Sequence, residues 1–472
     1  MATTTGQFVD VVLLGIAFML IFTAFQSCGM IQTVVLEQAA KNSTTGIDSH
    51  SGYISLAIIY GSFTFCNFFA PPIIALIGPK LAMALGGITY TLFLGSFLKP
   101  MAWFLYTCSG IMGLGAAVIW TGQGNYITLS SDEDTIGRNS GVSWALLQCS
   151  FLIGSAFLYG VFRDTTEITV KTRNVVYIVF TVLAAAGTIM LLCLRKPRPI
   201  RTSYERFDDN DSAARSPDDI RQIDSVEIHP DAATQSLPSP ANPATCAGFI
   251  ESFTRTFRLL FTFDMFLLSI VFIYTGLELS FFSGVYGTAL ANTKYFTTDA
   301  NAMLGLSGMF IGLGEVLGGA LFGLFGKHTV RNSRNPIILL GFIVHMLAFS
   351  LIFVNIPDGA PVHVTDPTTL AYIAPIKELG VFCSFLLGFA DSCWNTQLYS
   401  ILGSMFPTDS APAFALYKFF QSGAAMVAFF YSIELHLRWH LLILVVSAFC
   451  GSLSFFVVEW KHMLDTVNRR VA

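Results

Sequence analysis

The sequence predicts an all-α membrane protein with twelve transmembrane helices in two bundles of six. Twelve apolar segments each approach the roughly 20 residues that a helix needs to cross the hydrocarbon core of a bilayer. One long charged segment divides them six and six. Only 12% of the 472 residues are charged, whereas soluble domains carry about 25%. Little of the chain is therefore left for a soluble domain.

The apolar segments define the expected helices in chain order. The first six cover residues 11–35, 53–77, 81–98, 102–128, 140–162 and 174–194. The last six cover residues 265–290, 302–326, 336–354, 378–402, 412–433 and 439–459. Helix-breaking and charged residues mark the turns after the second and third segments, at Gly78-Pro79-Lys80 and at Lys99-Pro100.

Residues 195–262 separate the two sets of helices and predict a disordered cytosolic linker. This segment is rich in Asp, Ser, Pro and Arg, and its acidic part has too few apolar residues to fold. We therefore expect an N-terminal bundle over 1–194 and a C-terminal bundle with a short cytosolic tail over 263–472.

The distribution of Lys and Arg predicts that both termini lie in the cytosol. Outside the linker these residues divide evenly between the predicted inner and outer loops, so the linker's membrane-proximal ends decide the orientation. The basic residues there are Arg195, Lys196, Arg198, Arg201, Arg255 and Arg258. The sequon at Asn42 then lies in the first outer loop, where a glycan can be attached. The sequence does not distinguish a plasma membrane from an endolysosomal one.

Weak internal repeats relate the two halves in parallel. The Trp-x-x-Gln pattern of Trp120 and Gln123 returns in Trp394 and Gln397. Glutamine recurs at Gln148 and Gln421, and the turn around Gly78 and Lys80 has a counterpart in the loop around Gly326 and Lys327. The order of these pairs is that expected if the last six helices repeat the first six. Parallel repeats of six helices are the major facilitator architecture.

The two repeated turns also resemble the gating signature of that superfamily, in which an Asp precedes a Gly and basic residues. In this chain Ala75 and Gly323 occupy the place of the Asp. The resemblance implies that Gly78, Lys80, Gly326 and Lys327 form the gating loops. It also implies that the charge contacts which lock the cytosolic gate in the family are missing here.

Three segments resemble the Unc-ninety-three-like branch of the superfamily more specifically. They are residues 113–126, residues 53–60 and residues 391–397. The resemblance implies twelve spans and a central cavity. It also implies that transport is open to question, because the better-understood members look more like companions of ion channels and receptors than like solute carriers.

Four charged residues lie inside predicted helices of the second half: Glu278, Glu315, Asp391 and Lys418. An Asp or Lys at mid-membrane costs at least about 2.5–3.5 kcal/mol on insertion scales, so each marks a cavity or a partner. The first half offers only neutral polar groups at such depths, for example Gln26, Asn67, Gln123, Asn125 and Gln148. This asymmetry places the candidate site in the second half.

Two interpretations of these charges compete. In one, a buried carboxyl group binds and releases a proton and so couples a gradient to conformational change. In the other, Lys418 forms a structural ion pair with one of the acids. Further cavity candidates are Asn395, Gln421, Trp120, Gln123, Trp394 and Gln397. The two Trp residues could stack on a substrate, or they pack where the halves meet. We expect His345 to be a hydrogen-bonded structural residue, and the glycines of segment 302–326 to serve close packing.

The sequence leaves two functions open. The first is a carrier that moves an unknown small solute by alternating access, with proton coupling through Glu278, Glu315 or Asp391. The second is a non-transporting subunit that regulates or escorts an ion channel or receptor. The chain has no phosphate loop, nucleotide fingerprint or zinc-protease motif. We therefore expect no enzyme activity, no metal, no cofactor and no nucleic-acid partner, with the lipid bilayer as the surrounding medium.

Overall fold

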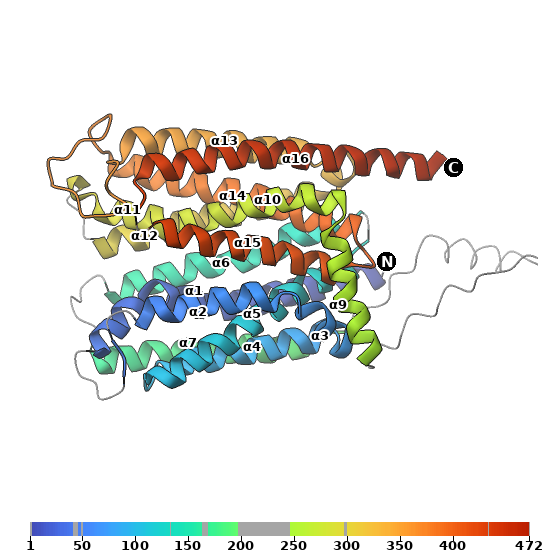
Figure 1. Ribbon diagram of the computed structural model, residues 1–472, viewed down its shortest axis with the longest axis horizontal. Coiled ribbons are helices and arrows are strands. Elements are labelled where there is room, and N and C mark those ends of the chain that lie inside the picture. Colours follow the sequence, from blue (N-terminus) through green and yellow to red (C-terminus); the bar gives the residue numbers. More distant parts are fainter. Residues whose placement is uncertain are drawn as a thin grey trace, which may run out of the picture.

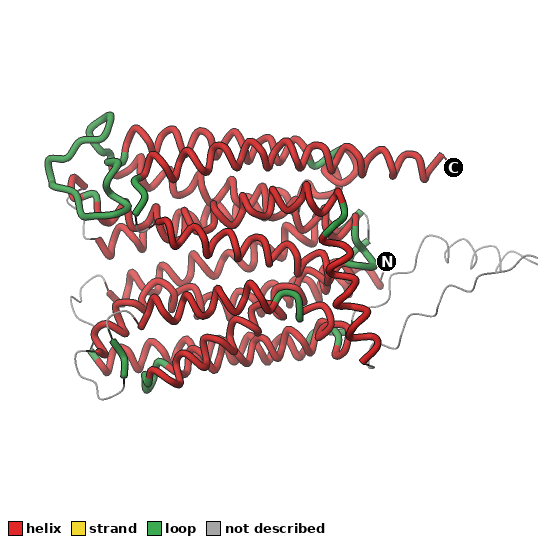
Figure 2. The backbone as a smooth tube through the Cα atoms, in the orientation of Figure 1, coloured by secondary structure: helices red, strands yellow, loops and turns green. Residues whose placement is uncertain are grey.

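The computed structural model describes residues 2–40, 46–48, 51–132, 134–162, 169–196, 246–296, 300–432 and 434–471. Within these residues every regular element is a helix (Figure 2). Nine of the helices in this part of the chain are long and apolar enough to cross a membrane, and a bent pair makes a tenth. Helices from the first half of the chain gather on one side and those from the second half on the other (Figure 1).

The described part of the N-terminal half contains seven helices. They are α1 (Ala2–Ala40), α2 (Ser51–Cys66), α3 (Ala70–Ile77), α4 (Pro79–Ser96), α5 (Ala102–Leu129), α6 (Ile136–Phe162) and α7 (Val170–Cys193). The predicted helix over 53–77 is therefore two helices, α2 and α3, which meet at an angle of 67°. Pro71 and Pro72 explain the break, because proline lacks the N–H that would continue the hydrogen bonds of α2.

The C-terminal half contains α10 (Phe263–Ser280), α11 (Tyr286–Asn292), α12 (Ala300–Asn332), α13 (Asn335–Asn355), α14 (Lys377–Met405), α15 (Ser410–Ser432) and α16 (Leu437–Val471). A π-helical turn, Phe281–Val285, joins α10 to α11, so the predicted helix over 265–290 runs through a wider turn. Several helices extend beyond their predicted ends, among them α1, which runs from Ala2 to Ala40 against a prediction of 11–35. α12 continues through Gly326 and Lys327, and α16 continues through the residues predicted to form a tail.

The predicted linker contains a helix, α9 (Cys246–Leu260), so the expectation of disorder was wrong for its last part. α9 lies across the ends of the other helices, at the end of the molecule where both chain termini lie (Figure 1). Its Phe257 stacks on Phe68 with ring centroids 4.8 Å apart, and its Arg255 pairs with Asp409 at 2.7 Å. α9 thus contacts both halves. Residues 197–245 of the linker lie outside the described part of the chain.

α6 and α12 form the closest contact between the halves, called here the α6–α12 seam. A methyl group added at Gly319 would lie 2.8 Å from the backbone nitrogen of Ala145, and one at Gly312 would lie 2.8 Å from that of Leu152. Only glycine permits such an approach of two backbones. The opposite face of α12 packs as closely on α14, where Gly314 meets the backbone of Phe385. The prediction that these glycines serve packing is confirmed.

Candidate functional site

The four charged residues predicted inside the membrane are all buried, with 1 to 4% of each residue exposed. They come from four different helices: Glu278 from α10, Glu315 from α12, Asp391 from α14 and Lys418 from α15. A charge in such an environment must be neutralised by a proton, a partner or a ligand. The contacts of each residue therefore indicate what it does.

The three acids form a group, called here the carboxyl cluster, with Asp391 at its centre. The side chain of Asp391 lies beside those of Glu278 and Glu315, close enough to interact with both. Asn395 donates a hydrogen bond to Asp391 over 2.7 Å. An ionised carboxylate only accepts hydrogen bonds, so a bond between two carboxyl groups forms only when one of them carries a proton. Neighbouring buried carboxyl groups of this kind are able to bind protons.

The carboxyl cluster reaches the N-terminal half through Trp144 of α6. The Trp144 indole nitrogen donates to Glu315 over 2.7 Å, and Gln148, one helical turn further along α6, lies near the same carboxyl group. Glu315 thus lies at the α6–α12 seam with partners in both halves. Sequence analysis missed Trp144. Its spacing of four residues from Gln148 was the signal that could have revealed a polar face on this helix.

On its other side the carboxyl cluster reaches α13. His345 Nε2 lies 3.2 Å from a carboxyl oxygen of Glu278, and Nδ1 of the same ring bonds to the Tyr274 hydroxyl. His345 is fully buried. The prediction of a hydrogen-bonded histidine is confirmed, but its partner makes it part of the candidate site. Polar side chains thus continue from α6 through α12, α14 and α10 to α13.

Lys418 lies among aromatic rings instead of against a carboxylate. Its ammonium nitrogen is 4.5 Å from the ring centroid of Trp120 and 4.4 Å from that of Tyr417. It donates one hydrogen bond, of 2.8 Å, to Gln421. In the described part of the chain no carboxylate comes within ion-pair distance of it. The structural ion pair considered from the sequence is therefore not formed there.

Hydrogen bonds join Lys418 to the carboxyl cluster. The Gln421 amide nitrogen donates to the Tyr417 hydroxyl over 3.2 Å, and that hydroxyl donates to Asn395, which holds Asp391. Across the halves, Tyr399 donates to Gln123 over 3.1 Å. One network thus contains most of the predicted residues: Glu278, Glu315, Asp391, Asn395, Lys418, Gln421, Trp120 and Gln123.

The repeat-related tryptophans have different surroundings. Trp120 covers Lys418 where the halves meet, as one interpretation predicted. Trp394 instead packs inside the C-terminal half, with its ring 4.8 Å from Tyr274 and its edge against Gly341 of α13. The expectation of packing between the halves was wrong for Trp394. Gln397 is buried and bonds to Thr396, apart from the network.

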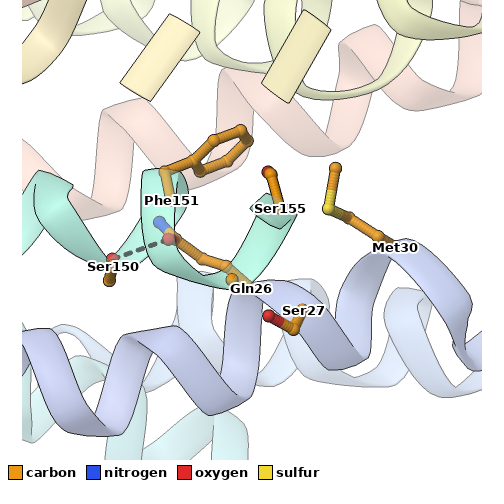
Figure 3. Close-up of a pocket in the computed structure, with 7 residues that line it drawn as sticks. Gln26, Ser27, Met30, Ser150, Phe151 and Ser155 are labelled. Atoms are coloured by element: carbon orange, nitrogen blue, oxygen red, sulfur yellow. Dashed lines mark hydrogen bonds between the residues drawn. The ribbon is translucent and has the colours of Figure 1, made fainter. Parts of the chain in front are cut away.

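A small hollow lies beside the network, between α1 and α6 (Figure 3). It is too narrow to hold a water molecule and is lined by Gln26, Ser27, Met30, Ser150, Phe151, Gly154 and Ser155. Ser150 donates to the Gln26 side chain across it, over 2.8 Å. A larger hollow of about 740 Å³ lies far from the network, between Pro357, Leu370 and His436 at the opposite end from α9.

The predicted gating residues do not form a pair of matching loops. Gly78 has a φ of 78° and makes a one-residue turn between α3 and α4, and Lys80 follows in the first turn of α4. Gly326 and Lys327 belong to α12, and their side chains lie outside the described part, as does Asn42. Gly323 lies against Gly141 and Val142 of α6. This contact explains the missing acid, because the seam leaves no room for a carboxylate.

Sequence analysis also missed a buried ion pair, because Arg334 was taken for a loop residue. Arg334 pairs with Glu459 of α16 at 2.9 Å and bonds to Ser400 of α14 at 3.0 Å. Both charged side chains are at most 2% exposed. The backbone nitrogen of Arg334 also donates to Glu459. This pair fastens three helices together at the start of α13.

Comparisons with known proteins agree with these observations. The sequence model of the family described as "Ion channel regulatory protein UNC-93" matches residues 43–456. The chain is 44% identical to UNC93-like protein MFSD11 of Xenopus tropicalis over 462 residues, which cover 98% of each protein. It is 23% identical to protein unc-93 homolog A of Homo sapiens, over 93% of this chain and 90% of that protein.

Two solved structures share the fold. The proton:xylose symporter XylE superposes with a TM-score of 0.64 at 12% identity, over 98% of this chain and 96% of its own. The human organic anion transporter MFSD10 superposes with a TM-score of 0.57 at 14% identity, over 96% of this chain and 99% of its own. At these identities the likeness concerns the fold alone. The protein is a multi-pass membrane protein of major facilitator fold, and the chain belongs to the UNC-93 family.

Proposed function

We propose that this protein moves a small solute across its membrane by alternating access and couples the movement to protons held by the carboxyl cluster. The proposal includes twelve spans: the nine helices that are long and apolar enough, the bent pair α2 and α3, and the less apolar α4 and α14 that run beside them (Figure 1). The observation that carries it is the close approach of Asp391 to the two buried glutamates.

The position of Glu315 supports coupling between protons and conformation. Its carboxyl group accepts from Trp144 of the other half and lies beside Asp391 within its own half. Loss of a proton from the cluster would leave negative charges close together in a low-dielectric interior, where their repulsion is strong. Entry of water, or movement of α12 away from α14 or α6, would lower this repulsion at the smallest cost in free energy. A proton bound at Asp391 thereby favours the closed seam.

The test is solute-dependent proton movement by the purified protein in vesicles with an internal pH-sensitive dye. Asp391→Asn keeps the shape of the side chain and removes its proton site, so it should abolish proton movement while the protein stays folded. Glu378→Gln is the matched control, because Glu378 is an exposed acid on the same helix α14. Equal proton movement in Asp391→Asn and the control would refute the coupling.

The α6–α12 seam favours a second candidate, a non-transporting subunit that regulates or escorts a channel or receptor. Glycines keep the halves in backbone contact from Gly141 to Leu152 of α6, and Gly323 replaces the gate acid. A disulfide between cysteines introduced at Ala145 and Gly319 would hold the seam closed. If this cross-link stops transport, the first proposal stands. If partner regulation persists with the cross-link and no solute moves without it, the second replaces it.

A further inference from the structure

We propose that Lys418 and Trp120 bind the carboxylate of a small organic monoanion, which is the solute of the carrier. This inference rests on the proposed transport function and specifies its substrate class. It starts from an ammonium group that is buried between the two halves of the protein without an ion-pair partner among the described residues.

The contacts of Lys418 leave part of its bonding capacity unused. An ammonium group has three N–H donors, and one of them is used by Gln421. Aromatic faces supply the other contacts, from Trp120, Tyr417 and the more distant Tyr399. Ring faces attract a cation but accept no strong hydrogen bond. Asp391 acts on the ammonium only from beyond ion-pair distance, and its own carboxyl group is engaged by Asn395 and the two glutamates.

The rings over Lys418 belong to different halves, which makes the site sensitive to conformation. Tyr417 precedes Lys418 on α15, whereas Trp120 is on α5. Trp120 also packs on Phe22 of α1, with ring centroids 4.7 Å apart, so it stays with the N-terminal half when the halves separate. Separation therefore removes one aromatic face from the ammonium and opens a place beside it. An anion that enters there replaces the lost contact with a charge-assisted hydrogen bond.

The residues around this place define the class of ligand. One ammonium group neutralises one negative charge, so a monoanion fits and a dianion leaves a charge buried. The indole of Trp120 offers a flat apolar surface for the body of the ligand, and the amides of Gln421 and Gln123 offer neutral polar contacts nearby. A cationic ligand would be repelled by Lys418. A small aromatic or aliphatic monocarboxylate matches all of these features.

The experiment compares three ligands of the same shape and different charge on the full chain purified in detergent. Benzoate is the anion, benzamide the neutral analogue and benzylamine the cation, each followed by thermal unfolding across a concentration series. Benzoate near 100 times its Kd should raise Tm by about 2–3 °C, and the two analogues should not. A chloride series at equal ionic strength separates binding of an organic anion from binding of any anion.

Two variants identify the site. Lys418→Met should weaken benzoate binding by about 10- to 100-fold, because the charge-assisted bond is lost. Trp120→Phe keeps an aromatic ring and should weaken benzoate binding less. This variant tests the site if Lys418→Met does not fold. Lys461→Met is the control, because Lys461 pairs with Asp264 away from the network, and it should bind benzoate as the wild type does.

The outcomes separate this inference from the transport proposal. Stabilisation by benzamide or benzylamine that depends on Asp391 would overturn the anion class and leave a carrier of another solute. If chloride alone raised Tm as much as benzoate does, the claim that the ligand is an organic anion would be overturned. Benzoate binding that survives in both Lys418→Met and Trp120→Phe would overturn the site. No response to any of the three ligands or to chloride, in protein that unfolds cooperatively, would overturn this inference. The transport proposal fails separately, if Asp391→Asn moves protons as the Glu378→Gln control does.

Discussion

Buried charges in this protein are neutralised in three different ways. Arg334 and Glu459 neutralise one another through a direct ion pair and a further hydrogen bond from the Arg334 backbone nitrogen. The acids of the carboxyl cluster lie beside one another and accept hydrogen bonds from Trp144 and Asn395. Lys418 is surrounded by ring faces and an amide. The first arrangement suits a fixed structure, whereas the other two are able to exchange a proton or a ligand and so suit a site.

The Arg334–Glu459 pair should be essential for stability. Arg334→Met leaves Glu459 buried without an opposite charge, because only the backbone nitrogen of residue 334 still donates to it. This should lower the free energy of unfolding by about 3–5 kcal/mol. Replacing both residues with Met removes both charges, so the double variant should recover most of that loss. Denaturant unfolding in detergent measures both variants. A single variant as stable as the wild type would show that Glu459 finds another partner.

Trp144 should be needed for the contact between Glu315 and the N-terminal half. Trp144→Phe keeps a ring at the seam but removes the N–H that donates to Glu315. The free energy of unfolding should fall by about 1–3 kcal/mol, because a buried acceptor loses its partner. Trp103→Phe is the control, since Trp103 on α5 is 68% exposed. Equal effects of the two changes on stability would argue against the role of this bond.

Among the helices, α12 has the least room for side chains, because it packs closely on both sides. Its glycines alternate between α6 of the other half and α14 of its own half. Bulkier side chains on the face of α12 toward α6 would hold the halves apart. On the face toward α14 they would displace Asp391 from Glu315. The composition of this helix is thus tied to the geometry of the carboxyl cluster as well as to packing.

Gly319→Ala should destabilise the protein by about 1–3 kcal/mol, since an added methyl group in a closely packed interface forces the backbones apart. Gly160→Ala on the partner helix α6 is the control, because nothing lies within 4 Å of the place its methyl group would take. That change should be neutral or stabilising by up to about 1 kcal/mol through helix propensity. Thermal unfolding of the two variants side by side measures the difference, and equal melting would show that the seam is looser.

At the scale of the whole molecule, α9 and both termini lie at one end (Figure 1). An even number of spans brings the two termini to the same side of a membrane, and the basic residues beside the linker favour the cytosolic side. α9 lies across this end with contacts to α3 and α15. On the predicted orientation, it lies where a cytosolic gate between the halves would open. Opening that gate would separate Arg255 from Asp409 or carry α9 with one half.

Epitope tags at the two ends provide the test of this topology. In intact cells both tags should be inaccessible to antibody, and both should become accessible when the membrane that faces the cytosol is permeabilised selectively. A tag in the loop between α13 and α14 should behave in the opposite way and is the internal control. Opposite behaviour of the two terminal tags would contradict an even number of spans.

The sequence by itself determined the features that follow from local composition. Apolar length identified the spans, prolines and glycines located the turn at Gly78, and charges at membrane depth identified the acids and Lys418 before any contact was known. The energetic cost of a charge in hydrocarbon applies wherever the residue sits along the chain, so these signals need no tertiary information. The repeat of Trp-x-x-Gln likewise indicated the major facilitator arrangement.

Only the tertiary structure decided which of these residues act together. It joined Asp391 to two glutamates, placed Trp144 and His345 beside them, left Lys418 among rings, and separated Trp394 from Trp120. It also showed α9 in a segment predicted to be unfolded. These contacts join residues from different helices. They depend on how the helices rotate and approach one another, and that is set by packing across the whole molecule.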